Sequence, residues 1–519
     1  MNDQDMSSLK LKWEFDNMHH CWQALSVIYC AHPSAPQLQC MNLFVPEAYL
    51  NADGTRADTG SCGGYTAMNA PVVFDNCIGG YSECTPDTLD SPRCQGMQYL
   101  DAGMVYVSVG ARGKQTRTAD GKAVGKAPAG LVDLKAAVRF LRHNREVLPG
   151  NTNRFISVGV SAGGAMSSLL GVTGNSKNYI PMLEEAGAAM DVTDTVYASQ
   201  CYCPIIDLDH ADIAYEWMFQ GVWTADGMGP FCPGGPLSAF QRALSAELMK
   251  AYIPYFNSLT LREPETGLTL SFGRDGRSGS AYQYLMKVIN QAATKHLQML
   301  SDRKLPVSYS AEDYIRGNYI YEEPDFSQRP EPGKPPVMVK KQGTDKRDWL
   351  AWDGKQAQVK SLDDLTHQYV NRLKPCTAFD ALDRGQAENQ EFGDTAQDCM
   401  HFDTYMPAAL AALADAFPEE SASYEKEYAE ALDNPAQERR KYLINPFSYI
   451  ATHEIAETAT YFRIRVGTHD PHTSFTMAMT LALKLAAAGA DVDYAMVWDE
   501  PHGPADYRGE IVDWIRSIV

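Results

Sequence analysis

The fold of this chain is decided by the stretch Phe155-Ile156-Ser157-Val158-Gly159-Val160-Ser161-Ala162-Gly163-Gly164-Ala165. It begins with an apolar, β-branched segment typical of a buried strand, continues through Gly-x-Ser-x-Gly, and ends in small residues that favour the start of a helix. This is the pattern of a nucleophile elbow, in which a serine lies on a tight turn above the edge of a sheet. Gly159 and Gly163 lack a Cβ, so strand and helix can approach closely. From these residues alone, a reactive Ser161 and an ordinary structural turn remain equally open.

The composition predicts a packed globular protein. The chain has 519 residues, of which 45% are hydrophobic and 10% aromatic. At about 150 residues per domain, this length suits either about three units or one enlarged α/β domain with an insertion. The net charge of -20 argues against a nucleic-acid or membrane partner, because both need a basic surface.

We expect no secretory signal at the start of the chain and no membrane span in its most apolar segment. Residues Met1 to Lys12 have no apolar core of the kind that a secretory signal needs. Thr476 to Ala490 contains Lys484 and is shorter than the roughly 20 residues that span a bilayer. We therefore expect a cytoplasmic protein, or a secreted one if a signal has been removed.

The 12 cysteines include seven in the first hundred residues, which suits either disulfides or buried thiols. No Cys-x-x-Cys pair occurs, so a structural zinc site is not expected, and we favour reduced thiols. The sequence predicts neither a cofactor nor a metal, and it leaves the oligomeric state and the cysteine pairing open.

Predicted strands and helices alternate along the chain up to the turn at Ser161. Met41–Pro46, Pro71–Asp75 and Val105–Val109 read as strands, and Leu131–Asn144 has apolar residues at helical spacing. This order predicts a parallel sheet with right-handed crossovers. The loop after the second strand contains Gly79-Gly80, which either offers a backbone N–H to a developing oxyanion or simply needs positive φ angles.

The alternation of strands and helices is lost between about Asp207 and Phe392. Helical patterns appear at Ser238–Tyr255 and Ala281–Asp302, and Pro324–Lys341 reads as a surface loop. We interpret this block as a helical insertion that covers the sheet. The predicted division is 1–206 for the first part of the core, 207–395 for the insertion and 396–519 for the second part of the core. Asp207–Asp212 lacks the glycine and terminal glutamate of a calcium loop, which favours ordinary capping and ion pairing.

Two polar loops follow the last two predicted strands. Asp470 follows the strand Tyr461–Gly467, and His502 follows the strand Val492–Trp498. The 32 residues between them accommodate one helix and one strand, so both loops are expected at the same edge of the sheet. A serine nucleophile needs an imidazole to take its proton and a carboxylate to orient that imidazole. In α/β-hydrolases these residues follow in the order Ser, Asp, His, as they do here.

Other residues compete for these roles. Asp499 is an alternative acid, but it lies on the same loop as His502 and is poorly placed to orient that ring. His469, His472 and His453 are alternative bases. His472 lies two residues after Asp470, and we expect it to face the substrate.

Several segments in one order resemble the bacterial tannases, α/β-hydrolases with a large lid domain. The matching segments are Leu43–Leu50, Gly79–Tyr81, Gly171–Ser176, Tyr202–Ile205, His210–Asp212, Ala214–Trp217, Asn445-Pro446, Arg463–Arg465 and the two loops with Asp470 and His502. The resemblance implies an α/β-hydrolase fold with a mostly parallel central sheet and a large helical lid. It also implies Ser161 as nucleophile, Asp470 as acid and His502 as base, with an oxyanion hole at Gly79, Gly80 and Ala162.

The resemblance further implies contacts to the phenolic hydroxyls of galloyl esters. The segment from Arg372 to Asp394 resembles the family's lid, and it suggests Lys374 and Glu388 as phenol contacts. Without the resemblance, a surface ion pair worth under ~1 kcal/mol is the simpler interpretation. Where the family has a second acid two residues after the triad acid, this chain has His472, which leaves the preference among hydroxybenzoyl esters open.

The sequence thus predicts a serine esterase that takes a small galloyl or hydroxybenzoyl ester. One alternative is a feruloyl or general aryl carboxylesterase. Another is a non-catalytic phenolic-ligand-binding protein on the same scaffold.

Overall fold

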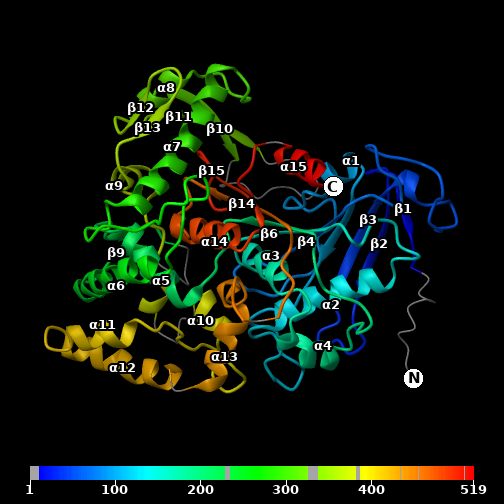
Figure 1. Ribbon diagram of the computed structural model, residues 1–519, viewed down its shortest axis with the longest axis horizontal. Coiled ribbons are helices and arrows are strands. Elements are labelled where there is room, and N and C mark those ends of the chain that lie inside the picture. The colour runs from blue at the N-terminus through cyan, green and yellow to red at the C-terminus, as the bar shows by residue number, and fades with distance from the viewer. Residues whose placement is uncertain are drawn as a thin grey trace.

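The computed structural model describes residues 11–227, 234–324, 337–380, 386–432, 434–453, 455–507 and 509–519. Within these ranges the chain forms a large central sheet with helices on both faces and a lid of helices and short hairpins beside it (Figure 1). The lid, coloured green to orange, occupies the left of the view, and the N-terminal strands lie at the right.

The central sheet has nine strands in the order β1-β2-β3-β5-β4-β6-β7-β14-β15. Strands β1, β2 and β3 pair antiparallel with their neighbours, and the pairs from β5 to β15 are parallel. The bounds are β1 Glu14–Asp16, β2 Cys21–Ile28, β3 Cys40–Pro46, β4 Val72–Asn76, β5 Val105–Val109, β6 Phe155–Val160, β7 Ala198–Tyr202, β14 Tyr461–Gly467 and β15 Asp491–Val497. The predicted mostly parallel α/β sheet is confirmed, while the antiparallel strands β1 and β2 were not predicted.

Helices cover both faces of this sheet because parallel strands need crossovers. They are α1 Gly96–Asp101, α2 Ala129–His143, α3 Ala162–Val172, α4 Ile180–Ala186, α14 Phe475–Ala487 and α15 Glu510–Ile518. The strands β3 and β5 are buried along their whole length, and α3 is buried at every position. The small residues at the start of α3 therefore allow close packing on the sheet.

Between β7 and β14 the described chain adds no strand to the central sheet. It forms the helices α5 Leu208–Met218, α6 Ala239–Ser258, α7 Ser280–Ser301, α8 Ala311–Arg316, α9 Leu362–Leu365, α10 Ala387–Glu391, α11 Met406–Leu413, α12 Pro418–Leu432 and α13 Pro435–Ile444. Three small antiparallel pairs accompany them: β8 Thr224–Ala225 with β9 Gly235–Pro236, β10 Tyr319–Pro324 with β11 Met338–Gly343, and β12 Leu350–Trp352 with β13 Ala357–Val359. Short turns are η2 Glu47–Tyr49, η3 Lys177–Tyr179, η4 Thr366–Val370, η5 Thr377–Phe379 and η6 Pro446–Ser448.

The insertion differs from its prediction in two respects. The predicted surface loop Pro324–Lys341 is wrong at its ends, which lie in β10 and β11, and residues 325–336 are outside the described residues. The alternating Tyr319, Ile320 and Tyr321 suit a strand, and Arg347 lies over the Tyr319 ring. Three helices, α11 to α13, which the sequence did not predict, also precede the return of the chain to the sheet at Tyr461. The boundary between residues 395 and 396 stays a prediction.

A buried ion pair fixes the part of the lid that faces the sheet. The Arg372 guanidinium donates to both oxygens of the Glu216 carboxylate, and Ser245 Oγ donates to Glu216 Oε2 over 2.6 Å. Both charged side chains are fully buried. Arg372 Nε also donates to the Lys374 carbonyl oxygen over 3.0 Å, so the pair positions the backbone beside Lys374.

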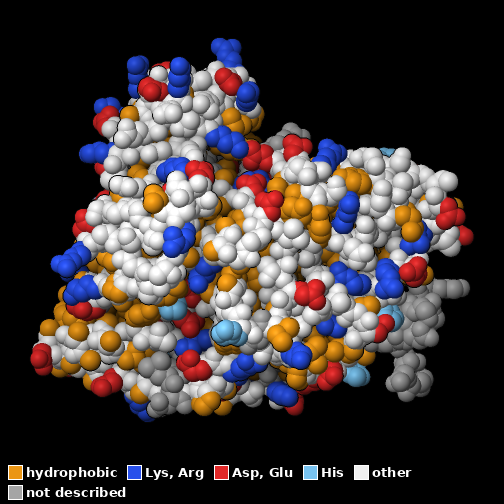
Figure 2. Space-filling model, in the orientation of Figure 1, with side chains coloured by type: hydrophobic (Ala, Val, Ile, Leu, Met, Phe, Trp, Pro, Cys, Tyr) orange, Lys and Arg blue, Asp and Glu red, His pale blue; other side chains and the backbone are white. Residues whose placement is uncertain are grey.

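On the face shown in Figure 2, acidic and basic side chains are interspersed. Within the described ranges, no helix is both long enough and apolar enough to cross a membrane. The eleven cysteines described are all free.

Candidate active site

Ser161 lies at the tight turn between β6 and α3. Its backbone has φ 63° and ψ −122°, a left-handed conformation that costs a non-glycine residue about 1–3 kcal/mol. Two hydrogen bonds to the next strand hold it there: Ser161 N–H donates to Tyr202 O over 3.0 Å, and Ile205 N–H donates to Ser161 O over 3.2 Å. The turn is therefore fixed to the carboxyl end of β7.

The glycines of the motif are required by close packing. A Cβ on Gly159 would lie 2.2 Å from the Gly163 carbonyl oxygen, and one on Gly163 would lie 2.7 Å from the Ile78 carbonyl oxygen. Asn76 Nδ2, at the end of β4, lies 2.9 Å from Val158 O and 3.1 Å from Gly163 O. The loop after β4 is thereby held against the first turn of α3.

This packing brings the loop that contains Gly79 and Gly80 close to the first turn of α3. Gly79 and Gly80 follow Ile78 directly, Gly80 has φ 55°, and its carbonyl oxygen accepts from Lys114 Nζ over 2.8 Å. Ala162 is the first residue of α3, where backbone N–H groups have no intrahelical acceptor. The oxyanion-hole role of these residues stays a prediction.

His502 and Asp470 form a hydrogen-bonded pair. His502 Nδ1 lies 2.8 Å from Asp470 Oδ2, and Asp470 is fully buried. The other carboxylate oxygen accepts from the His472 N–H over 2.8 Å. Burial disfavours a charged His502, but the Asp470 charge and its hydrogen bond outweigh burial and raise the pKa of His502 above its ordinary value. The neighbouring strands β14 and β15 bring the two loops together, as their spacing predicted.

The second hydrogen bond of a catalytic triad, between serine and histidine, is not formed in this structure. Among the described residues, the ring of His502 has no hydrogen bond to the Ser161 hydroxyl, and its Nε2 lies 4.0 Å from Cys203 Sγ. Cys203 is buried, has φ 34°, and follows Tyr202, whose carbonyl oxygen holds Ser161. Sequence reasoning missed this thiol at the site, although Tyr202-Cys203-Pro204-Ile205 was among the matching segments.

The competing acid and bases have other partners. Asp499 Oδ1 accepts from the Tyr314 hydroxyl over 2.8 Å and from the Tyr369 hydroxyl over 2.6 Å, so it joins the lid to the His502 loop. The His469 ring stacks on Tyr369 with centroids 4.6 Å apart, and burial lowers its pKa. His453 is exposed.

A narrow pocket brings Lys374, Glu388 and His472 together beside this pair. It is lined by Ile205, Leu208, Ala211, Asp212, Tyr215, Lys374, Cys376, Thr377, Glu388, Phe402, His472 and Thr473. Two contacts connect it to the predicted catalytic residues. The His472 and His502 rings stack with centroids 4.2 Å apart, and Ile205 bonds the Ser161 backbone.

The polar groups of this pocket include an ion pair, Lys374 and Glu388, and a neutral imidazole, His472. Lys374 Nζ lies 3.4 Å from Glu388 Oε1, and both side chains are largely buried, so the pair is not an ordinary surface ion pair. Burial opposes ionisation of Glu388, yet the Lys374 charge lowers its pKa overall, and within the described structure its buried Oε2 has no hydrogen-bond partner. Burial, with the charge of His502, lowers the pKa of His472 to about 4, so this ring is neutral at neutral pH.

Asp212 is a further pocket residue to which the sequence assigned no role. Its carboxyl accepts from the Thr377 N–H over 3.3 Å and from the Ala378 N–H over 2.7 Å. Burial and the neighbouring charges of Asp403 and Glu388 raise its pKa well above the ordinary value. The sequence signal that could have identified Asp212 is its position in the segment His210–Asp212, which resembles the tannases.

Over the described part of the chain, the side chains with metal-ligand spacing are Cys203, Asp470 and His502, which are the same groups that surround the histidine–carboxylate pair.

Comparisons with known proteins agree with this geometry. Residues 89–203 match the model of the BD-FAE esterase family. The chain is 31% identical to the tannin acyl hydrolase from Lactobacillus plantarum, covering 96% of this chain and 94% of that one, with a TM-score of 0.74. It is also 31% identical to the Fusobacterium nucleatum tannase, covering 96% and 95%, with a TM-score of 0.75.

Other similar structures carry small phenolic ligands. A tannin acyl hydrolase in complex with ethyl gallate is 31% identical, with coverage of 96% and 94% and a TM-score of 0.75. A search of curated proteins finds no match. The chain therefore belongs to the tannin acyl hydrolase family, as a tannase-like esterase with the α/β-hydrolase fold.

Proposed function

We propose that this protein hydrolyses galloyl and related hydroxybenzoyl esters, including those of hydrolysable tannins and alkyl gallates, and releases gallic acid. The observation that carries the proposal is the stacking of His472 on His502, because it joins the histidine–carboxylate pair to the pocket with Lys374 and Glu388. Similar structures in complex with ethyl gallate and with 3,4-dihydroxybenzoate support this substrate class.

In the proposed mechanism, Ser161 Oγ attacks the ester carbonyl carbon. A rotation of its hydroxyl toward His502 Nε2 lets the imidazole accept the proton, and the Asp470 carboxylate stabilises the resulting imidazolium. Catalytic hydrogen bonds are often long in a free enzyme and tighten with substrate. The missing Ser161–His502 bond is compatible with this step.

In this mechanism, backbone N–H groups of Ala162 and of the Gly79–Gly80 loop stabilise the oxyanion. Each such donor is worth about 3 kcal/mol of transition-state stabilisation. The protonated His502 then donates its proton to the leaving alcohol, which departs and leaves a galloyl ester on Ser161. Water, deprotonated by His502, attacks this ester and releases gallate.

The pocket supplies recognition of the phenolic ring. The free Oε2 of Glu388 accepts from a phenolic hydroxyl, and the Lys374 ammonium donates to the adjacent oxygen. The neutral His472 ring hydrogen-bonds a further hydroxyl. An ester without ring hydroxyls leaves these buried polar groups unpaired, which lowers its rate.

Two alternatives follow from particular observations. The match to the BD-FAE esterase family favours a feruloyl or general aryl esterase as the second candidate. The absence of a Ser161–His502 hydrogen bond within the described structure is the one feature in favour of a non-catalytic phenolic-ligand-binding protein.

The substrate class is tested by comparing methyl gallate with methyl ferulate on the purified protein. We expect kcat/KM to be at least about tenfold higher for methyl gallate, because its vicinal hydroxyls pair with Lys374 and Glu388. Ser161→Ala is expected to reduce kcat by about 10⁴-fold or more, and Ser168→Ala on the same helix provides the control. Faster ferulate cleavage contradicts the galloyl assignment, and full activity of Ser161→Ala contradicts the nucleophile.

The pH dependence tests the His502–Asp470 pair. The base must be neutral, so kcat/KM falls as pH drops through the raised pKa of His502. Asp470→Asn removes the charge that raises this pKa, so the acid limb moves to lower pH while kcat falls by about 10⁴-fold. Asp493→Asn, on β15 in an ion pair with Arg465, is the control and keeps the limb in place. An acid limb unmoved in Asp470→Asn would exclude His502 as the titrating base.

His472 is predicted to tune the choice of acyl group. A carboxylate accepts stronger hydrogen bonds from phenols than a neutral imidazole does. His472→Asp should therefore raise the ratio of kcat/KM for methyl gallate over methyl 4-hydroxybenzoate by about tenfold. His453→Asp, at an exposed position, should leave the ratio unchanged. The same ratio in His472→Asp as in the wild type would place this residue outside the acyl pocket.

A further inference from the structure

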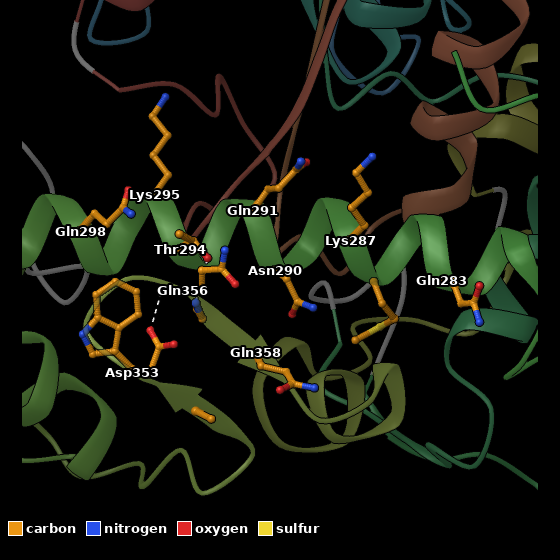
Figure 3. Close-up of a pocket in the computed structure, with 14 residues that line it drawn as sticks. Gln283, Lys287, Asn290, Gln291, Thr294, Lys295, Gln298, Asp353, Gln356 and Gln358 are labelled. Atoms are coloured by element: carbon orange, nitrogen blue, oxygen red, sulfur yellow. Dashed lines mark hydrogen bonds between the residues drawn. The ribbon is translucent and has the colours of Figure 1, made fainter. Parts of the chain in front are cut away.

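A second cavity lies in the lid, between α7 and the β12–β13 hairpin (Figure 3). It has a volume of about 820 Å³, within the range of small-molecule sites. None of its lining residues belongs to the pocket with Lys374 and Glu388. It is therefore a separate site, and the proposed reaction assigns it no role.

Carboxamides dominate the walls of this cavity. Of the fourteen lining residues, six are glutamine or asparagine, and one is the half-buried Trp352. We call these seven residues the carboxamide groove: Gln283, Asn290, Gln291, Gln298, Gln356, Gln358 and Trp352. In Figure 3, Gln356 and Gln358 come from the hairpin, Asn290 on α7 points toward it, and Gln291 extends to the opposite side of α7.

The groove rests on a fixed scaffold. Thr294 Oγ1 accepts from the Ala357 N–H over 2.9 Å, and Asn290 Oδ1 accepts from the Val359 N–H over 2.8 Å. Gln298 Nε2 donates to the Lys355 carbonyl oxygen over 2.9 Å. Three side chains of α7 thus hold the hairpin, and the spacing between the two walls is set before any ligand arrives.

The two lysines at the groove are already paired, and the exposed Asp353 carboxylate, which accepts from the Lys355 and Gln356 N–H groups, adds a negative charge. Lys287 Nζ binds Glu263 and Glu265 at 3.0 and 2.7 Å, and Lys295 Nζ binds Glu510 at 2.5 Å. Figure 3 shows both lysine side chains extending to the side of α7 away from the hairpin. An anionic ligand would need unpaired cations in the groove, so a neutral ligand fits better.

The carboxamides, in contrast, have spare hydrogen-bonding capacity. Among the described residues, the side chains of Gln283, Gln356 and Gln358 have no hydrogen-bond partner, and the hydrogen bond of Gln356 to the Asp353 carboxylate comes from its backbone N–H. A carboxamide presents a donor and an acceptor side by side, which matches the vicinal hydroxyls of a sugar. Trp352 adds an apolar ring that suits the C–H face of a pyranose.

We propose that the carboxamide groove binds a neutral oligosaccharide. The groove combines uncharged donor–acceptor pairs, an aromatic ring and neutralised lysines, and this combination is the chemistry that recognises a polyol. The site is independent of the ester hydrolysis proposed above, because binding there involves no residue of the acyl pocket. Its role is to hold the enzyme on glycosylated material.

The test uses the full-length protein with cellotetraose and maltotetraose as probes. Saturation-transfer difference NMR detects contact, and calorimetric titration measures the dissociation constant. We expect saturable binding of at least one probe, and about tenfold weaker binding in Trp352→Ala. Gln358→Ala changes an exposed side chain that has no hydrogen bond to another described residue, so it tests the groove even if Trp352→Ala is unstable.

Matched controls separate the groove from the rest of the surface. Trp22→Ala removes a tryptophan of similar exposure on β2 and should bind the probe as the wild type does. Hydrolysis of methyl gallate should be unchanged in Trp352→Ala and Gln358→Ala, because neither residue touches the acyl pocket.

Four results would overturn the proposal. These are no saturable binding of either tetrasaccharide, unweakened binding in both groove variants, tighter binding of the acidic tetragalacturonate, and displacement of the bound sugar by methyl gallate. None of them depends on whether the protein cleaves galloyl esters, so the two proposals fail separately.

Discussion

The left-handed backbone of Ser161 is the constraint on which the rest of the site depends. A non-glycine residue at φ 63° persists only where its surroundings fix the backbone. Here Tyr202 and Ile205 form hydrogen bonds to the Ser161 backbone on one side. On the other side Asn76 joins β4 to the first turn of α3. The strain places the serine hydroxyl at the edge of the sheet, where three further loops converge.

The lid is joined to this edge through side chains that also shape the pocket. The buried Arg372–Glu216 pair positions the backbone beside Lys374, and Tyr314 and Tyr369 bond Asp499 on the His502 loop. Removing one partner of a buried ion pair costs about 3–5 kcal/mol. The lid therefore forms part of the pocket beside the His502–Asp470 pair, and its packing on the sheet sets the shape of that pocket.

The sequence predicted the parts of this structure that depend on local patterns. Apolar strands, the Gly-x-Ser-x-Gly turn and the spacing of Asp470 and His502 follow from period and chain order. Cys203 beside His502 and the carboxyl group of Asp212 in the pocket were not predicted, because tertiary packing alone brings them there. The hairpin β10–β11 was missed because its proline- and charge-rich flank resembles a loop. The neutral state of His472 likewise depends on burial, which no motif encodes.

The central claim is that Ser161 carries the acyl group during turnover. Rapid acid quenching of the protein with methyl gallate, followed by peptide mass spectrometry, measures this most directly. The account predicts one galloyl group on the peptide that contains Ser161, formed and lost at the rate of turnover. Turnover of methyl gallate with the acyl group on another residue, or on none, would contradict it.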